Sequence, residues 1–296
     1  MNPEQSSMIS IHVAVIFFGL AGLFGKLVAL PAPLIVLGRV VFACLVLAVL
    51  LVGQRRSPKL HGRRDGFYMV LMGLVLAIHW ITFFQAIKVS TVAIGLLTFS
   101  TFPVFVTFME PYFFNEHLRR SDVMVALAAV AGVALVIPRF EFASQIVQGV
   151  IWGIASGFSF AALSMLNRRF ARHYPSLVIA FYQDLVAAVV LLPLVFIYDI
   201  RWALKDILLL VFLGVVCTGF AHSLFIKGMA RIKARTASVV ACLEPVYGII
   251  VAAFLLNEMP DMRVMAGGVV ILCAAAYASL KDVSTPAGNP AQETDQ

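Results

Sequence analysis

The sequence contains few charged residues. Only 12% of its 296 residues are Asp, Glu, Lys or Arg, 61% are apolar, and the mean hydropathy is +0.97. Because a soluble domain carries about 25% charged residues, this composition excludes an ordinary soluble fold. We therefore expect an all-α transmembrane protein.

Sequence motifs of other membrane-protein classes are missing as well. There is no HExxH, no GxGD and no pair of aspartates, and Ile154 stands where a Gly-x-Ser-Gly motif ending at Ser156–Gly157 requires glycine. A membrane-embedded enzyme is therefore only a distant alternative. No TVGYG-like segment is present to form the filter of a channel.

Cysteine is scarce and is placed for packing. The four cysteines lie inside apolar segments, without a CxxC pair or a histidine at metal-ligand spacing. They are Cys44, Cys217, Cys242 and Cys273. We predict neither a metal site nor a disulfide, and no cofactor.

Ten apolar stretches are long enough to cross a bilayer, which needs about 20 mostly apolar residues. Their approximate ranges are 11–30, 33–52, 67–87, 91–113, 122–138, 146–166, 177–198, 206–226, 235–257 and 263–280. Residues 1–10 form a short N-terminal segment, and residues 281–296 are predicted to be a disordered tail.

The net charge of +7 is distributed unevenly between the two sides of this arrangement. The loops after the second, fourth, sixth and eighth stretches, together with Lys281, hold 15 Lys and Arg residues, whereas the alternate loops hold five. This bias predicts that both termini are cytoplasmic and that the chain lies in the inner membrane. It argues against nucleic acid as the partner of the positive charge.

The two halves of the chain repeat at an offset of 142 residues. Pro33, Pro103 and the pair Asn115–Glu116 recur as Pro175, Pro245 and Asn257–Glu258. Each copy contains five apolar stretches, and a unit with an odd number of crossings enters the membrane from opposite sides in its two copies. We therefore expect two inverted five-helix repeats, at 11–138 and 146–280, an architecture typical of secondary transporters.

The spacing of each repeated proline and glutamate, with twelve residues between them, resembles the EamA branch of the drug/metabolite transporter superfamily. The string ARTASVVACLEPVYG at 234–248 is similar to that family, as is HWITFFQA at 79–86. The resemblance covers residues 11–280 and implies ten helices in two halves around a central cavity, with the fifth and tenth helices outside it. It implies a carrier of a small solute but does not specify which one.

Two cations within apolar stretches are candidates for binding an anionic group. Lys26 lies four and seven residues after Gly22 and Gly19, on the helix face that small residues suit for packing, and Arg39 lies six residues into the second stretch. Ionisable residues inside membrane segments usually face a cavity. The alternative for both is that their long side chains extend to the lipid headgroups.

Further candidates lie deeper in the membrane. His79 is near the middle of the third stretch, and Trp80 beside it would provide an aromatic wall. Glu244 lies next to Pro245, where a kink frees backbone groups, and is the candidate for carrying a proton. Tyr182 and Gln183 are added as solute-binding candidates, whereas Asp184 and His222 are left open between a site and packing.

The remaining motifs favour structure. Glu116 and Glu258 precede the fifth and tenth helices and are expected to cap them. Gly149, Gly153 and Gly157 form a double GxxxG ridge that suits internal packing or a homodimer face, so monomer and homodimer both remain open.

Taken together, these features predict a secondary transporter of a small metabolite, such as an amino acid or another zwitterionic or anionic solute. Alternating access would occur around a central cavity, and protons are a candidate coupling ion. A multidrug or amine exporter of the same superfamily is the alternative.

Overall fold

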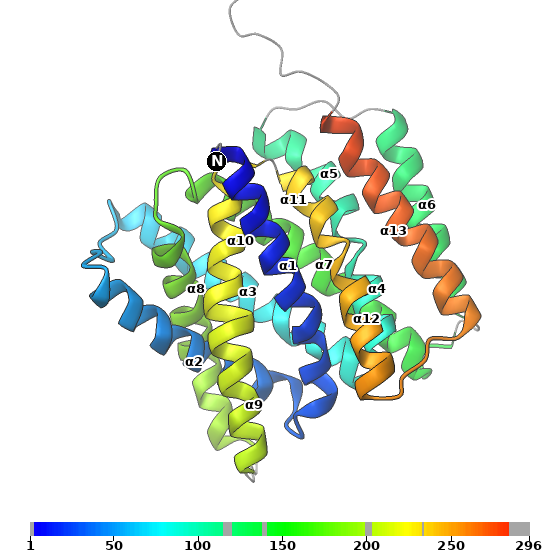
Figure 1. Ribbon diagram of the computed structural model, residues 1–296, viewed down its shortest axis with the longest axis horizontal. Helices are drawn as coiled ribbons and strands as arrows, with labels where there is room; N and C mark the ends of the chain where they lie inside the picture. The colour runs from blue at the N-terminus through cyan, green and yellow to red at the C-terminus, as the bar shows by residue number, and fades with distance from the viewer. Residues whose placement is uncertain (1–2, 115–119, 138–140, 199–202, 233, 284–296) are drawn as a thin grey trace, which may run out of the picture.

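The computed structural model describes residues 3–114, 120–137, 141–198, 203–232 and 234–283, and all regular structure in these ranges is helical (Figure 1). The first half contains α1 (Pro3–Leu27), α2 (Ala32–Gly53), α3 (Arg63–Val89), α4 (Val92–Phe99), α5 (Phe102–Phe114) and α6 (Arg120–Val136). The second half contains α7 (Gln145–Phe170), α8 (Ser176–Leu191), η1 (Leu192–Phe196), α9 (Leu204–Gly214), η2 (Val215–Phe220), α10 (Ala221–Met229), α11 (Ala234–Ala241), α12 (Glu244–Leu255) and α13 (Met262–Val283).

Seven of the helical segments are long and apolar enough to cross a membrane. They are Glu4–Leu27, Ala32–Gly53, Arg63–Val89, Val92–Phe114, Gln145–Phe170, Ser176–Phe196 and Leu204–Met229. Three shorter apolar helices, Val123–Val136, Glu244–Leu256 and Met262–Ala274, fall within the other three predicted stretches. The expectation of a multi-pass helical membrane protein is therefore confirmed.

The helix ends differ from the expected ones at both termini. α1 begins at Pro3, within the predicted N-terminal segment, and α13 continues to Val283, so the start of the predicted tail is helical. The remainder of that tail, 284–296, lies outside the described residues.

Pro103 and its repeat, Pro245, mark breaks within long helical segments. α4 and α5 are separated at Ser100–Thr101, just before Pro103, and α11 and α12 are separated at Cys242–Leu243, just before Pro245. A proline has no backbone N–H and its ring crowds the preceding turn, so a helix commonly bends or restarts there. The second break puts Glu244 at the first turn of α12.

The repeated Asn-Glu pair has a backbone explanation in the second half. Asn257 follows the end of α12 and adopts a φ of 53°. Asparagine tolerates this left-handed conformation, which commonly ends a helix. Its first-half equivalent, Asn115, lies outside the described residues.

The glycine ridge of α7 packs inside the bundle, as one of its two predicted uses requires. A Cβ atom added to Gly149 would lie 2.2 Å from Ser90 Oγ, and one added to Gly153 would lie 1.9 Å from Thr98 Oγ1. At Gly157, the added atom would lie 2.9 Å from the carbonyl oxygen of Phe99. α7 therefore uses its glycines to approach α3, α4 and the α4–α5 turn.

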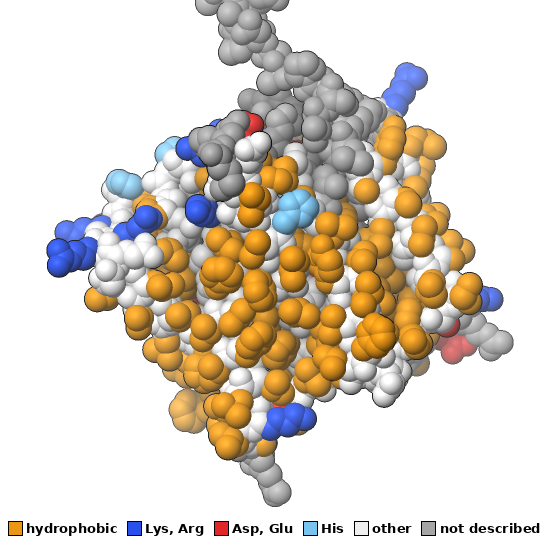
Figure 2. Space-filling view, viewed as in Figure 1, with side chains coloured by type: hydrophobic (Ala, Val, Ile, Leu, Met, Phe, Trp, Pro, Cys, Tyr) orange, Lys and Arg blue, Asp and Glu red, His pale blue; other side chains and the backbone are white. Residues whose placement is uncertain are grey.

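Apolar side chains cover the visible outer face of the helices, whereas Lys and Arg gather at its margins (Figure 2). Exposed apolar residues include Leu45, Val49 and Val52 on α2, with 58%, 69% and 79% of their surface accessible. Such a continuous apolar surface is suited to lipid rather than water. α6 and α13 pack side by side at one side of the molecule (Figure 1).

Candidate functional site

A small cavity, with an internal volume of about 30 Å³, lies among the helices and is lined by residues from both halves of the chain. Its walls are Phe18 and Ala21 of α1, Arg39 of α2, Leu76, His79, Trp80 and Phe83 of α3, Phe99 of α4, Phe160 of α7, His222 of α10 and Glu244 of α12. Four sequence-predicted site residues, Arg39, His79, Trp80 and Glu244, therefore lie around one space.

Arg39 is almost fully buried, with 2% of its surface accessible, and does not extend toward headgroups. Its Nε donates a hydrogen bond of 2.9 Å to Thr218 Oγ1 of η2. Its Cζ lies 3.8 Å from the ring centre of Trp80 and 5.3 Å from that of Phe84. In the described part of the chain no hydrogen bond or ion pair reaches its two terminal nitrogen atoms.

His79 is anchored to α7. Its Nδ1 lies 2.9 Å from Ser156 Oγ and 3.1 Å from the Ser156 carbonyl oxygen. Ser156 precedes Gly157, one of the glycines that bring α7 close to its neighbours, so the packing of the ridge also sets the position of the imidazole. The ring lies among Phe99 and Phe160, with ring centres 5.5 and 4.9 Å away.

Glu244 reaches the cavity because α1 packs tightly on the start of α12. Gly19 allows this approach, since a Cβ atom added to it would lie 2.8 Å from the Glu244 carbonyl oxygen. The Glu244 side chain is 4% exposed, and no hydrogen bond to its carboxylate occurs among the described residues. Among the described residues, Arg39 forms no ion pair with this carboxylate or with that of Asp184.

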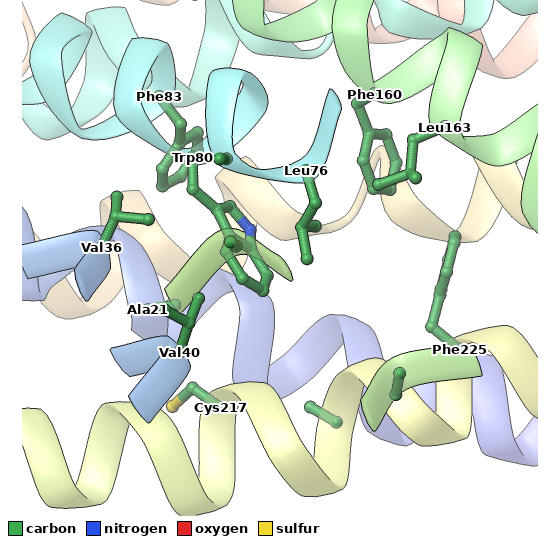
Figure 3. Close-up of a cluster of buried hydrophobic side chains, with 14 of the residues drawn as sticks. Ala21, Val36, Val40, Leu76, Trp80, Phe83, Phe160, Leu163, Cys217 and Phe225 are labelled. Atoms are coloured by element: carbon green, nitrogen blue, oxygen red, sulfur yellow. The ribbon is translucent and has the colours of Figure 1, made fainter. Parts of the chain in front are cut away.

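Aromatic rings form most of the remaining wall. Trp80 extends from α3 toward Ala21 and Val40, and Phe160 projects from α7 beside Leu163 (Figure 3). The Trp80 ring also contacts His222, with centres 5.6 Å apart. The site therefore combines one cation, one carboxylate and two imidazoles with an aromatic lining.

Lys26 lies away from this cavity, contrary to the expectation that it and Arg39 form one cationic patch. It occupies the last turn of α1, where its Nζ donates to the Ser90 carbonyl oxygen at 2.7 Å and lies 3.9 Å from Glu258 Oε1. Its side chain lies on the packed face of α1, as the glycine spacing predicts, but at the end of the helix bundle rather than beside the cavity. The long stem of lysine reaches the α3–α4 turn there.

Glu258 caps a helix, but not the expected one. Its Oε2 accepts a 2.9 Å hydrogen bond from the backbone N–H of Val92 at the start of α4. The first turn of α13 is capped by Asp261, whose Oδ1 accepts from the Val264 N–H at 2.8 Å. Sequence proximity suggested α13, whereas tertiary packing brings Glu258 to α4; Glu116 lies outside the described residues.

Tyr182 and Gln183 also lie outside the cavity lining. The Tyr182 hydroxyl donates to the Pro58 carbonyl oxygen at 2.8 Å, and Gln183 Nε2 donates to Asn167 Oδ1 at 2.7 Å. Both contacts join α8 to neighbouring segments. Asp184 is fully buried next to them, and neither of its carboxylate oxygens has a hydrogen-bond partner among the described residues.

A second ion pair joins α5 to α7. Arg168 Nη1 lies 2.5 Å from Glu110 Oε1, and the Arg168 guanidinium carbon lies 4.0 Å from the ring centre of Phe114. The two side chains are 7% and 0% exposed. This buried pair lies at the C-terminal ends of both helices.

The apolar part of the lining was not identified from the sequence. Phe18, Phe99 and Phe160 are three of the 24 phenylalanines in the chain, and nothing in their local sequence separates them from lipid-facing ones. His222 carried a signal, because a histidine within an apolar stretch is unusual, but its depth alone did not distinguish a cavity from packing. In the described ranges no group of three or more His, Cys, Asp or Glu side chains is arranged to hold a metal ion.

The fold resembles that of a solved structure, and the sequence is similar to those of known transporters. A solved crystal structure superposes with a TM-score of 0.68 over 95% of this chain and 99% of its own, at 22% identity. The S-adenosylmethionine uptake transporter of Rickettsia bellii is 25% identical over 71% of this chain and 72% of its own length. The pseudopaline exporter CntI of Pseudomonas aeruginosa is 26% identical over 83% and 85%, and the uncharacterized transporter YwfM of Bacillus subtilis is 24% identical over 74% and 77%.

The family comparison matches each half of the chain separately. The EamA-like transporter family matches residues 5–137 and again residues 147–280. Relatives with named activities are transporters rather than enzymes. The chain is a membrane protein of the EamA-like transporter family.

Proposed function

We propose that this protein is a secondary transporter of a small solute bearing a carboxylate, such as an amino acid or another zwitterion or anion. The observation that carries the proposal is the buried Arg39 guanidinium in the cavity, with both terminal nitrogen atoms unbonded within the described chain. A guanidinium binds a carboxylate through two parallel hydrogen bonds, and burial strengthens such charge-assisted contacts.

The other lining residues complete a site for a zwitterion. Glu244 would receive an amine or carry a coupled proton, and His79 would offer a polar contact. Trp80, Phe99 and Phe160 supply aromatic surface for an apolar substituent. Small-molecule sites commonly combine such an apolar wall with a few placed polar groups.

One named relative supports a solute that bears a carboxylate. S-adenosylmethionine, the solute named for the Rickettsia protein, contains an α-amino acid group with both a carboxylate and an amine. An exporter of amines or cationic drugs is the second candidate, favoured by Glu244 and the aromatic lining. Arg39 disfavours it, because an unneutralised guanidinium repels a cation in a site with few compensating charges.

Alternating access between two inverted five-helix repeats would move the solute. The helix packing supports this arrangement, since α1 packs on α10 and α12 while α7 packs on α3 and α5, and α6 packs on α13. The 142-residue repeat relates α1 to α7, α10 to α3, α12 to α5 and α13 to α6, so each of these contacts has a counterpart in which the two halves change roles. Lys26 and Arg168 are also 142 residues apart (168 − 26), and each forms an ion pair at the end of its helix.

The two ion pairs would close opposite sides of the cavity in turn. We place the protein in the inner membrane with both termini in the cytoplasm. In this orientation, the Arg168–Glu110 pair would face the cytoplasm and the Lys26–Glu258 pair would face the outside. The matched positions of Lys26 and Arg168 support this assignment, because an inversion turns one end of a repeat into the other.

Transport by the purified protein in proteoliposomes tests the proposal. Thermal-shift screening against amino acids, organic acids, amines and nucleotides first selects the solute, and counterflow of that labelled solute is then measured. We expect saturable, trans-stimulated uptake that Arg39→Gln reduces at least about tenfold and that Arg231→Gln, at an exposed arginine, leaves unchanged.

The solute preference and its response to Arg39 separate the alternatives. Selection of amines with undiminished transport by Arg39→Gln would favour the amine exporter. Unsaturable current without counterflow would replace a carrier with a channel.

A further inference from the structure

A π-helical turn lies against the cavity arginine. η2 (Val215–Phe220) interrupts the helical run from α9 to α10, and Thr218 within it is fully buried. Single π-helical turns within α-helices are rare and occur frequently at functional sites. This turn places the Thr218 hydroxyl within hydrogen-bond distance of Arg39.

The Thr218 hydroxyl has a fixed orientation. It donates its single proton to the Leu213 carbonyl oxygen, five residues earlier, at 2.8 Å. Only its oxygen lone pairs then remain for Arg39, whose Nε donates at 2.9 Å. A threonine hydroxyl has one proton and two lone pairs, so these two bonds assign donor and acceptor without ambiguity.

This contact determines which edge of the guanidinium is free. Because Nε is held by Thr218 and one face lies on Trp80, both terminal nitrogen atoms are left for a ligand. That edge presents two parallel N–H groups and can form paired hydrogen bonds with a planar carboxylate, whereas the edge that contains Nε is occupied by Thr218. A side chain held only by its stem would lose rotational freedom on binding the solute, which weakens affinity.

Glycine brings the π-helical turn close enough to α2 for this contact. A Cβ atom added to Gly214 would lie 2.6 Å from the Arg39 carbonyl oxygen and 2.6 Å from Phe42 Cβ. One added to Gly219 would lie 2.7 Å from Val46 Cγ1. The two glycines flank Thr218 in sequence and permit its hydroxyl to reach the interior of α2.

We infer that Thr218 is a positioning residue that presents the terminal edge of Arg39 to the carboxylate of the solute, and so contributes to selection of carboxylates over neutral analogues. The inference rests on the proposed function, because it concerns the same site. Thr218 does not line the cavity itself, and as an uncharged residue it does not stand out in the sequence of an apolar helix.

The test compares variants that differ by one hydroxyl. Thr218→Val removes the hydroxyl at nearly constant volume, Thr218→Ser retains it, and Thr98→Val makes the same change at a fully buried threonine that bonds only within its own helix. The probes are succinate and benzoate, each compared with its neutral amide, and L-leucine, compared with L-leucinamide, which keeps the ammonium group and lacks the carboxylate. Affinity is measured by calorimetry on the purified protein.

We expect Thr218→Val to weaken binding of the carboxylates about tenfold and to change amide binding little, since a hydrogen bond to a charged group is lost. Thr218→Ser and Thr98→Val should bind like the parent. If Arg39→Gln weakens carboxylate binding but Thr218→Val does not, the positioning role is wrong. If Arg39→Gln itself has no effect, the proposed function fails instead.

A readout that needs no solute accompanies these measurements. Trp80 is one of three tryptophans, and Trp152→Phe with Trp202→Phe leaves it as the sole indole reporter. Because Arg39 stacks 3.8 Å from its ring, displacement of the guanidinium should change its fluorescence. Thr218→Ala, which adds no bulk, should reproduce the change caused by Thr218→Val, and Thr218→Ser should not; identical spectra in all variants would overturn the inference.

Discussion

Among single residues, Glu244 is the carboxylate best placed to link solute movement to protons. It lines the same cavity as Arg39, is almost fully buried, and forms no ion pair within the described part of the chain. The affinity of a buried acid for its proton depends on the charges and hydrogen bonds around it, so binding of a solute beside it can change that affinity.

We therefore predict that Glu244→Gln abolishes the dependence of net flux on an imposed pH gradient. A glutamine keeps the shape and polarity of the side chain but cannot release a proton. Exchange of labelled for unlabelled solute should persist, because exchange needs no net proton movement. Proteoliposome flux with and without the gradient checks this, and gradient-driven flux in the variant would assign coupling elsewhere.

At the scale of elements, the closest helix approaches depend on glycines rather than on large apolar side chains. Gly153→Ala should lower the free energy of unfolding by about 1–3 kcal/mol, since overpacking displaces neighbours. The added methyl would meet Thr98 Oγ1 and Cβ at 1.9 and 2.9 Å.

Gly53→Ala is the matched control, because no atom lies within 4 Å of its added Cβ. Thermal unfolding in detergent compares the two variants. Equal stability for both would contradict the close approach of α4 to α7 at Gly153.

The two ion pairs should contribute different amounts to the free energy of unfolding. Arg168→Met leaves Glu110 buried beside an apolar side chain and should cost about 3–5 kcal/mol of stability. Lys26→Met removes the 3.9 Å contact with Glu258 and the hydrogen bond to the Ser90 carbonyl oxygen, but the Lys26 and Glu258 side chains are about one quarter exposed, so it should cost less, about 1–2 kcal/mol.

Urea titration at low and high salt measures both effects. Added salt should weaken only the Lys26–Glu258 contact, because exposed charges are screened and buried ones are not. A comparable salt dependence for Arg168–Glu110 would indicate that water reaches that pair.

Prediction from sequence succeeded where a pattern repeats along a helix. The α7 glycine ridge and the break beside Pro245 follow from local chemistry. Prediction failed where a side chain acts on a distant element. Lys26 contacts the α3–α4 turn and Glu258 caps α4, 166 positions away, and neither contact has a local sequence signature.

The cavity illustrates the same limit. Buried ionisable residues are costly in membranes, so Arg39 and Glu244 were identifiable as candidates. Thr218 was not, because its importance depends on a π-helical turn whose sequence, VVCTGF, is as apolar as its surroundings. Tyr182 and Gln183 were also predicted as site residues; they lie outside the cavity lining, and their side chains contact segments adjacent to α8.

For the whole molecule, the charge asymmetry of the loops predicts cytoplasmic termini. A C-terminal fluorescent-protein fusion should fluoresce, and a C-terminal alkaline-phosphatase fusion should be inactive, because that enzyme matures only outside the cytoplasm. Moving the fusion point to the loop near Lys205 should reverse both results. An active phosphatase at the C-terminus would contradict the ten-helix topology as well as the orientation.

The burial of Arg39 has a consequence for how the protein enters the membrane during synthesis. An arginine at the centre of a helix costs about 2.5–3.5 kcal/mol at insertion, whereas each Leu, Ile, Val or Phe returns about 0.3–0.6 kcal/mol. α2 carries six Leu, six Val, one Ile and one Phe, and its mean hydropathy of 2.9 is the highest among the seven long apolar segments. The insertion free energy of its apolar residues, including the lipid-facing Leu45, Val49 and Val52, thus offsets the cost of inserting Arg39. The helix can therefore enter the membrane before the other helices surround the arginine.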